Sequence, residues 1–259
     1  MQELIQFLKI NIEKKIFFII GAGSNVLFKD DIFDGVVIKL SGNFSRLSLL
    51  NETTIVAGSG ALDKTLSNFA LEHSLGGFEF LSCIPGSVGG GIRMNSGCFG
   101  REFKDIIVSV QVINKNGEVF TIPSKDIVFN YRSCSLPGDL IFLSATFHGE
   151  KKDKKKIEEE INILKNKKDI AQPTRVKTGG STFKNPIKDT NKKVWEIIKE
   201  SVPDNVQFGD AIISNKHSNF FVNKGDASYK DMKKLIDYVK ENVKNKTGVN
   251  LDLEIILVE

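Results

Sequence analysis

A glycine-rich stretch near the middle of the chain constrains the fold more than any other part of the sequence. It reads FEFLSCIPGSVGGGIRMNSGCFG over residues 78–100, and six of its glycines lie between positions 86 and 100. Glycine loses more backbone freedom on folding than any other residue, so it is used where φ must be positive or where the backbone must approach a ligand closely. Pro85 and Gly86 open the run, and Asn95 closes it. The composition predicts a loop whose N–H groups bind an anion or a flat polar ring; an ordinary cluster of turns is the alternative.

The rest of the composition is that of a soluble globular protein, with 41% hydrophobic and 26% charged residues among 259. The net charge of +4 is weak, and the densest lysine run, KKDKKK at 151–156, has no interleaved aromatic residues. We therefore expect a solvated helix face there and no nucleic-acid partner. Cys83, Cys98 and Cys134 lack metal-ligand spacing, which favours free thiols in a reducing cytoplasm and no metal. The longest early apolar run, 16–20, is too short for a membrane span, and no signal peptide is expected.

A second glycine turn follows an expected buried strand at 15–20. It reads Gly21-Ala22-Gly23-Ser24-Asn25. The third glycine of a G-x-G-x-x-G dinucleotide-binding motif would fall at position 26, which is Val26, so a standard Rossmann site is disfavoured. A phosphate-facing turn with Ser24 and Asn25 as donors remains plausible.

Hydrophobic periodicity and turn residues predict a mixture of short strands and helices. Strands are expected at 35–40, 53–58 (ending in a turn with Gly58 and Gly60), 106–113, 118–122, 140–147, 219–223 and 251–258. Helices are expected at 61–74, from the lysine run to about 168, around Trp195, and from a helix-start box at Ser228 to Gly248.

Six motifs taken together resemble the UDP-N-acetylenolpyruvoylglucosamine reductase family. They are GAGSN (21–25), IPGSVGGGIRMNSGCFG (84–100), NYRS (130–133), GGSTFKNP (179–186), KHSNFFVN (216–223) and LDLEI (251–255), in family order over essentially the whole chain. The resemblance implies an α+β fold of the vanillyl-alcohol-oxidase/PCMH type that binds FAD, with an additional α+β substrate-binding domain. It implies NADPH-dependent, FAD-mediated reduction of UDP-N-acetylglucosamine enolpyruvate to UDP-N-acetylmuramate in peptidoglycan precursor synthesis. We expect a cytoplasmic enzyme and a monomer.

The resemblance also implies a domain organisation. The first FAD-binding subdomain is expected at 1–56 and completed by 248–259, the second at 57–170, and the substrate-binding domain at 171–247. The short connection after Tyr131 and Arg132 is similar to the compact type of the family. The usual N-terminal strand segment before GAGSN is missing, so we expect either a shortened form of a longer reading frame or weak FAD binding. Asp210 stands where the family usually has a second glycine, and Cys134 replaces a common serine.

The implied reaction assigns roles to three side chains. Hydride addition to the terminal carbon of an enolpyruvyl ether leaves an enolate beside a carboxylate, so the site needs a cation, an acid and a proton donor. Arg132 suits the carboxylate because its planar fork makes two hydrogen bonds, with a surface ion pair as the alternative. Ser181 suits proton delivery, with a cap as the alternative. Glu254 suits the acid if apolar residues on both faces of a terminal strand desolvate it and favour its protonated form; an ordinary strand-edge glutamate is the alternative.

The remaining site residues follow from the motifs. For the cofactor we expect Gly21, Ala22, Gly23, Ser24, Asn25, Gly58, Pro85, Gly86, Ser87, Gly89, Gly90, Asn95 and Gly97. For the substrate we expect Tyr131, Lys184, Asn185 and His217, with Lys184 and Asn185 as candidates for the diphosphate and a structural histidine as the alternative at His217.

Two other functions compete with the reductase. One is an FAD-dependent oxidase of the same fold acting on another substrate, against which the GGSTFKNP loop and Glu254 argue. The other is a non-catalytic FAD- or nucleotide-binding relic. A visible absorption spectrum of the purified protein separates the relic from both enzymes.

Overall fold

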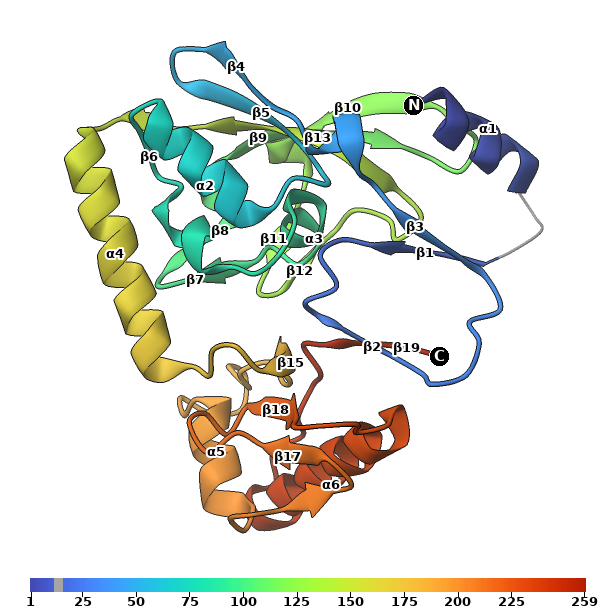
Figure 1. Cartoon of the computed structure of the whole chain (residues 1–259), viewed down its shortest axis with the longest axis vertical. Helices are drawn as coiled ribbons and strands as arrows, with labels where there is room; N and C mark the ends of the chain where they lie inside the picture. Colours follow the sequence, from blue (N-terminus) through green and yellow to red (C-terminus); the bar gives the residue numbers. More distant parts are fainter. Residues whose placement is uncertain (12–15) are drawn as a thin grey trace. The chain divides into compact units, whose positions relative to one another are not determined.

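The computed structural model describes residues 1–11 and 16–259, and within them the chain forms two compact units. Unit 1 comprises Met1–Ala22 and Asp34–Asn166, and unit 2 comprises Gly23–Phe33 and Lys167–Glu259. Figure 1 labels the elements of both. Lys15, the first residue of the strand expected at 15–20, lies outside the described residues. The predicted division into three domains, with boundaries at 56/57, 170/171 and 247/248, stays a prediction.

Unit 1 is built on a five-stranded sheet in the order β10-β9-β13-β5-β4, with every neighbouring pair antiparallel. Its strands are β4 (Leu47–Asn51), β5 (Thr54–Gly58), β9 (Ile107–Ile113), β10 (Val119–Pro123) and β13 (Ile141–His148). The hairpin expected at 106–113 and 118–122 is therefore confirmed. Alternate side chains of β9 and β13, such as Val110 and Phe147, are fully buried, as one covered sheet face requires.

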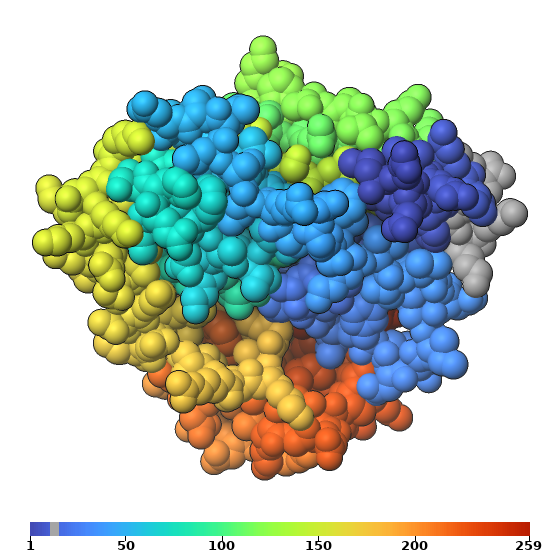
Figure 2. Space-filling model, turned by 45° about the horizontal axis from the view of Figure 1, so that its top comes forward, coloured from blue at the N-terminus to red at the C-terminus, as the bar shows by residue number. Residues whose placement is uncertain are grey.

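α-Helices and short 3-10 helices, which are labelled η, cover that sheet. They are α1 (Gln2–Asn11), η1 (Gly42–Ser45), α2 (Asp63–Glu72), η2 (Glu79–Cys83), α3 (Val88–Arg93), η3 (Phe103–Asp105) and η4 (Ser124–Asp126); α4 (Lys154–Ala171) leads into unit 2. On the face shown in Figure 2, α2 lies between the β4–β5 hairpin and α4, as it does in Figure 1. Phe78, Phe103 and Phe147 meet edge to face beneath these elements, with ring centroids 5.9–6.4 Å apart.

Short strand pairs complete unit 1. They are parallel β1 (Phe17–Ile20) with β3 (Val36–Lys39), and antiparallel β6 (Leu75–Gly76) with β14 (Glu150–Lys151), β7 (Gly97–Cys98) with β8 (Arg101–Glu102), and β11 (Phe129–Asn130) with β12 (Ser133–Cys134). The turn between β11 and β12 holds Tyr131 and Arg132.

Unit 2 is a four-stranded antiparallel sheet in the order β15-β18-β17-β16, packed with two helices. Its elements are β15 (Lys177–Ser181), α5 (Val194–Ser201), β16 (Gln207–Phe208), β17 (Ala211–Ile213), β18 (Phe220–Asn223) and α6 (Tyr229–Thr247). The predicted start and end of α6 are confirmed: Ser228 and Asp231 form a reciprocal capping box, and Gly248 ends the helix at φ 76°.

The last strand is shorter than the sequence predicts. Only β19 (Ile256–Val258) forms, paired in parallel with β2 (Val26–Phe28). The prediction that Glu254 lies inside a strand from 251 to 258 is therefore wrong. Ile256 is 39% exposed, so the expectation of two apolar buried faces is wrong as well.

Candidate active site

The central glycine stretch is not one open loop. Residues 88–93 form the short helix α3, and three consecutive glycines lie within it. The segment before and at its start runs antiparallel to residues 59–63: Asp63 N donates to Gly86 O (3.1 Å), Val88 N to Ala61 O (2.9 Å) and Gly89 N to Ser59 O (2.8 Å). The two segments therefore lie in direct backbone contact.

Several glycines are required by close packing inside unit 1. A Cβ on Gly86 would lie 2.5 Å from Asp63 Oδ2, and one on Gly89 would lie 3.1 Å from Ser59 Cβ. A Cβ on Gly58 would meet Phe44 O at 2.1 Å, and one on Gly97 would meet Arg101 O at 2.2 Å. Their expected role in holding a cofactor stays a prediction, because packing alone accounts for a glycine at each of these positions.

Gly90 differs from the glycines around it. It is exposed, and the nearest atom to an added Cβ would be Ser87 Oγ at 3.6 Å, so its backbone faces open space. Gly21 lies against the same serine, since its Cβ would fall 2.3 Å from Ser87 Oγ. The start of the GAGSN turn and the central glycine stretch thus meet at Ser87. A bare, reachable backbone beside a hydroxyl suits a flavin dinucleotide, and a side chain at position 90 would occupy that space.

Asp63, the first residue of α2, is a buried acid that sequence reasoning missed. Asp63 is fully buried, and neither of its carboxyl oxygens has a hydrogen-bond partner among the described residues. Burial raises the pKa of the Asp63 carboxyl well above its ordinary value, so the neutral acid is favoured. Ser59 Oγ, on the segment that pairs with the glycines, is likewise buried without a described partner.

Asn95 is held on all sides within unit 1. It is fully buried, its Nδ2 donates to Glu102 Oε2 (2.9 Å) and Asn130 O (3.1 Å), and its Oδ1 accepts from Lys104 N (3.0 Å). This network joins the end of the glycine stretch to the strand that precedes Arg132. Asn95 therefore supports the segment from inside.

Arg132 occupies an uncommon backbone conformation. Its φ is 56°, in the left-handed region that non-glycine residues rarely adopt. The guanidinium lies 5.0 Å from the ring centre of Tyr131, and Nη2 donates to Gly97 O at 3.1 Å. A backbone outlier held by such contacts is typical of a functional position.

In unit 2, an irregularity in strand pairing precedes Ser181 at the end of β15. The pairing of β15 with β18 shifts register between Thr178 and Ser181, and Gly180 has φ 81°. Thr178 Oγ1 accepts from Gly180 N (3.2 Å) and donates to Phe221 O (2.7 Å). Bulges of this kind redirect a side chain next to a site, and here glycine supplies the required positive φ.

Ser181 and Glu254 come from neighbouring segments of unit 2. Glu254 N donates to Thr182 O (2.9 Å), Phe183 and Leu253 form a single antiparallel bridge, and Lys184 N donates to Asp252 O (2.8 Å). Both side chains are half-buried. The structure therefore places side by side the segments that carry two of the three predicted catalytic residues, which are 73 positions apart in the sequence.

Asn219 fixes the backbone that follows Ser181. The sequence did not single this residue out. It is 2% exposed; its Oδ1 accepts from Phe183 N (3.0 Å) and its Nδ2 donates to Phe183 O (2.9 Å), while its own carbonyl accepts from Thr182 N (2.8 Å). Its place in the KHSNFFVN motif was the available signal. Asn185 also has a structural contact, since its Oδ1 accepts from Val194 N (3.0 Å) at the start of α5.

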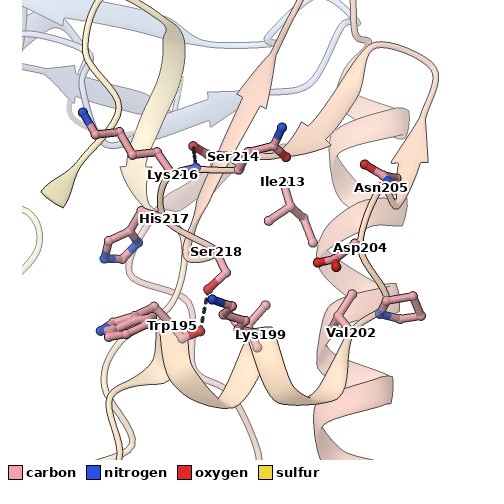
Figure 3. A pocket seen from close by; sticks show the side chains of 13 residues that line it. Trp195, Lys199, Val202, Asp204, Asn205, Ile213, Ser214, Lys216, His217 and Ser218 are labelled. Atoms are coloured by element: carbon pink, nitrogen blue, oxygen red, sulfur yellow. Dashed lines mark hydrogen bonds between the residues drawn. The ribbon is translucent and has the colours of Figure 1, made fainter. Parts of the chain in front are cut away.

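His217 lines a hollow of about 130 Å³ in unit 2. Figure 3 shows its ring beside Trp195, with Asp204 and Asn205 across the hollow; the two ring centroids are 6.0 Å apart. Burial lowers the pKa of His217, and Nδ1 lies 3.3 Å from Asn219 N, which can donate to it. A neutral ring that accepts at Nδ1 carries its proton on Nε2 and can donate from there. Lys199 and Lys216 line the same hollow.

The described residues contain neither a metal-binding cluster nor a membrane-spanning helix. No group of three or more histidine, cysteine or acidic side chains there could hold a metal ion. No helix in the described ranges has the length and apolar character needed to span a membrane.

Comparisons with known proteins match both parts of the chain. Residues 1–123 match the family model of the FAD binding domain, and residues 172–258 match the model of the UDP-N-acetylenolpyruvoylglucosamine reductase C-terminal domain. The UDP-N-acetylenolpyruvoylglucosamine reductase of Pelagibacter ubique is 60% identical over 257 residues, which cover 99% of this chain and 85% of that protein. The enzyme of the same name from Rickettsia conorii is 41% identical over 254 residues (98% and 85%). The crystal structure of UDP-N-acetylenolpyruvylglucosamine reductase from Thermus caldophilus matches with a TM-score of 0.85 and 29% identity, over 98% of this chain and 90% of that one.

Proposed function

Because the chain belongs to the UDP-N-acetylenolpyruvoylglucosamine reductase family, we propose that it reduces UDP-N-acetylglucosamine enolpyruvate to UDP-N-acetylmuramate. It is an FAD-dependent oxidoreductase with the vanillyl-alcohol-oxidase/PCMH-type FAD-binding fold, and NADPH is its reductant. The resemblance carried by the six motifs is thereby confirmed. The observation that carries the proposed chemistry is the bond from Glu254 N to Thr182 O, which sets Glu254 beside the residue that follows Ser181.

When bound, FAD would supply the hydride chemistry that links NADPH to the terminal carbon of the enolpyruvyl group. The exposed backbone at Gly90, beside Ser87, is a part of unit 1 that fits its binding. In the proposed chemistry Glu254 hydrogen-bonds the enolate oxygen that develops, which lowers the energy of the charged transition state. Ser181 donates its hydroxyl proton to the carbon next to the carboxylate and regains one from solvent. Arg132 binds the substrate carboxylate through its guanidinium fork.

We assign the hollow at Trp195 and His217 to the nucleotide part of the substrate. A uracil ring can stack on the exposed indole, and the Nε2–H of neutral His217 can donate to a carbonyl oxygen of the base or a sugar hydroxyl. Lys199 and Lys216 supply positive charge for the diphosphate. Lys184 and Asn185, on the segment that follows Ser181, remain the predicted alternatives for that role.

The two half-reactions test this proposal separately. In Ser181→Ala, reduction of the flavin by NADPH should stay within about twofold of the parent, while reoxidation by the enolpyruvyl substrate should fall about 10²–10⁴-fold, the usual loss for a positioned proton donor. Rapid-mixing absorbance at the flavin band measures both rates. Ser201→Ala is the control and should leave both rates unchanged; it removes a different hydroxyl of unit 2, one that is buried without a described partner. Equal slowing of both half-reactions in Ser181→Ala would mean that the serine supports the fold or the cofactor, and its donor role would be abandoned.

Glu254 gives a graded series in the same assay. Glu254→Gln keeps a neutral hydrogen-bond donor, so its reoxidation rate should lie between those of the parent and Glu254→Ala. Glu254→Ala removes the donor and leaves a void, and should be slower than Glu254→Gln. If Gln and Ala are equally slow, the group required is an acidic proton and the hydrogen-bonding role is wrong.

A further inference from the structure

At one end of the parallel pair β2–β19, a side chain makes the hydrogen bond that the backbone would make in a regular ladder. Val26, Leu27 and Phe28 pair with Ile256, Leu257 and Val258. Beyond the strands, Lys29 N donates to Val258 O (2.9 Å) at one end, and Ile256 N donates to Asn25 O (2.9 Å) at the other. In a parallel ladder, bonds from the two strands alternate at even spacing, so the next rung would run from the backbone N–H of residue 25 to the carbonyl of residue 254.

The side chain of Asn25 makes that rung instead. Its Nδ2 donates to Glu254 O at 3.0 Å, in a partly buried contact between residues 229 positions apart. Asn25 thus holds the final segment twice, through its backbone carbonyl to Ile256 N and through its side-chain amide to Glu254 O. A side-chain amide has a peptide's donor geometry and can extend a ladder by one bond.

Both backbone polar groups of Glu254 are therefore fixed by other segments. Its N–H donates to Thr182 O at 2.9 Å, next to Ser181, and its carbonyl accepts from Asn25. Glu254 lies outside a strand, so no regular ladder fixes it there. Removing the Asn25 amide would take away the hydrogen bond to the Glu254 carbonyl.

We propose that Asn25 is a positioning residue for Glu254, and that its side chain acts on the proton chemistry through this acid. This inference rests on the proposed function of Glu254 and goes beyond it. The Asn25 side chain sets the peptide of the acid, and the acid touches the reacting atoms. A displacement of about 1 Å at such a group can lower a rate about 10²-fold.

The test uses Asn25→Ala and Asn25→Asp in the full chain, with Asn242→Ala as the same chemical change on α6. Asn25→Asp keeps the size of the side chain but removes the donor. It therefore tests the same hydrogen bond if Asn25→Ala folds poorly. We expect the FAD dissociation constant to stay within about threefold and flavin reduction by NADPH within about twofold, while reoxidation by the enolpyruvyl substrate falls about 10–100-fold. Asn242→Ala should change none of these.

A double-mutant cycle with Glu254→Ala shows whether Asn25 acts through the acid. If it does, Asn25→Ala slows reoxidation by less than about twofold in the Glu254→Ala background. The same fold-loss in both backgrounds would overturn the proposal, as would a large rise in the FAD dissociation constant with unchanged reoxidation at saturating FAD.

Amide hydrogen exchange without added cofactor gives a readout independent of activity. In Asn25→Ala, the Glu254 N–H should exchange about fivefold faster, the change expected for loss of one ordinary hydrogen bond from a local opening equilibrium. Unchanged exchange at Glu254 would contradict the placement itself. If the parent protein fails to oxidise its reduced flavin with the enolpyruvyl substrate, the proposed function is wrong, and this exchange result still decides whether Asn25 holds Glu254.

Discussion

Asn219 offers the sharpest test of how unit 2 is held together. Its amide makes two hydrogen bonds to the backbone of Phe183, at 3.0 and 2.9 Å, and the residue is 2% exposed. Asn219→Ala leaves the buried N–H and C=O of Phe183 without these partners. Each buried group left unsatisfied costs about 1–3 kcal/mol, so the free energy of unfolding should fall by about 2–6 kcal/mol. Flavin reoxidation should slow as well, because the same peptide segment carries Ser181 and pairs with Glu254.

Urea unfolding followed by tryptophan fluorescence is the assay, because Trp195 is the only tryptophan of the chain and lies in unit 2. Asn242→Ala is the control: its half-buried side chain donates to Tyr238 O at 2.8 Å on α6. Alanine favours a helix, so this change should shift the free energy of unfolding by no more than about 0.5 kcal/mol. If Asn219→Ala costs no more than Asn242→Ala, the Phe183 bonds do not support the unit and the reasoning is refuted.

Three further outcomes are expected. Purified protein should be yellow with non-covalent FAD near one equivalent, as released flavin in the denatured supernatant would show; a colourless protein that takes up no added FAD contradicts this. Because burial lowers the pKa of His217, the unfolded state binds the proton more readily and stability should fall as pH drops below about 6.5, by at most about 1.4 kcal/mol per pH unit; His217→Gln should lose this part of the slope in urea titrations at pH 7.5 and 5.5. Because burial raises the pKa of Asp63, its contribution to stability is full below the ordinary pKa near 4 and is lost as pH rises through the folded-state pKa. Asp63→Asn should therefore unfold at higher temperature than the parent at pH 8, with a smaller difference at pH 5 by calorimetry, and a constant difference would contradict this.

The glycine stretch shows both the strength and the limit of composition. So many glycines in one segment predicted a backbone that approaches a ligand closely, whereas the structure shows several of them packed against other segments of unit 1. The partner that is approached could not be predicted, because Asp63 lies 23 positions before Gly86 and the ring of Phe103 lies against Gly91. A single sequence carries no signal for such pairings, and the same composition serves packing at one glycine and open backbone at Gly90.

Strand limits were missed for a related reason. The alternation of Leu251, Leu253, Ile255 and Leu257 predicted one long strand, but a strand extends only as far as its partner. β2 has three residues, so β19 has three as well. The segment before it instead follows residues 182–184, through Lys184 N to Asp252 O and Glu254 N to Thr182 O. Pairing of Ser181 with Glu254 in one site came from motif order in the family, and periodicity alone would not have produced it.

The GAGSN motif is divided between the two units. Gly21 and Ala22 belong to unit 1, where Gly21 lies against Ser87, while Gly23, Ser24 and Asn25 belong to unit 2. Gly23 has φ 78°, a conformation that an alanine would strain by about 1–2 kcal/mol. Substitutions along these five residues should therefore fall into two classes: a side chain at position 21 would push against Ser87 in the glycine segment, whereas loss of the Asn25 amide would disturb Glu254. Because neighbouring residues of the motif contact different partners, we expect their substitutions to affect different properties, and each residue has to be tested separately.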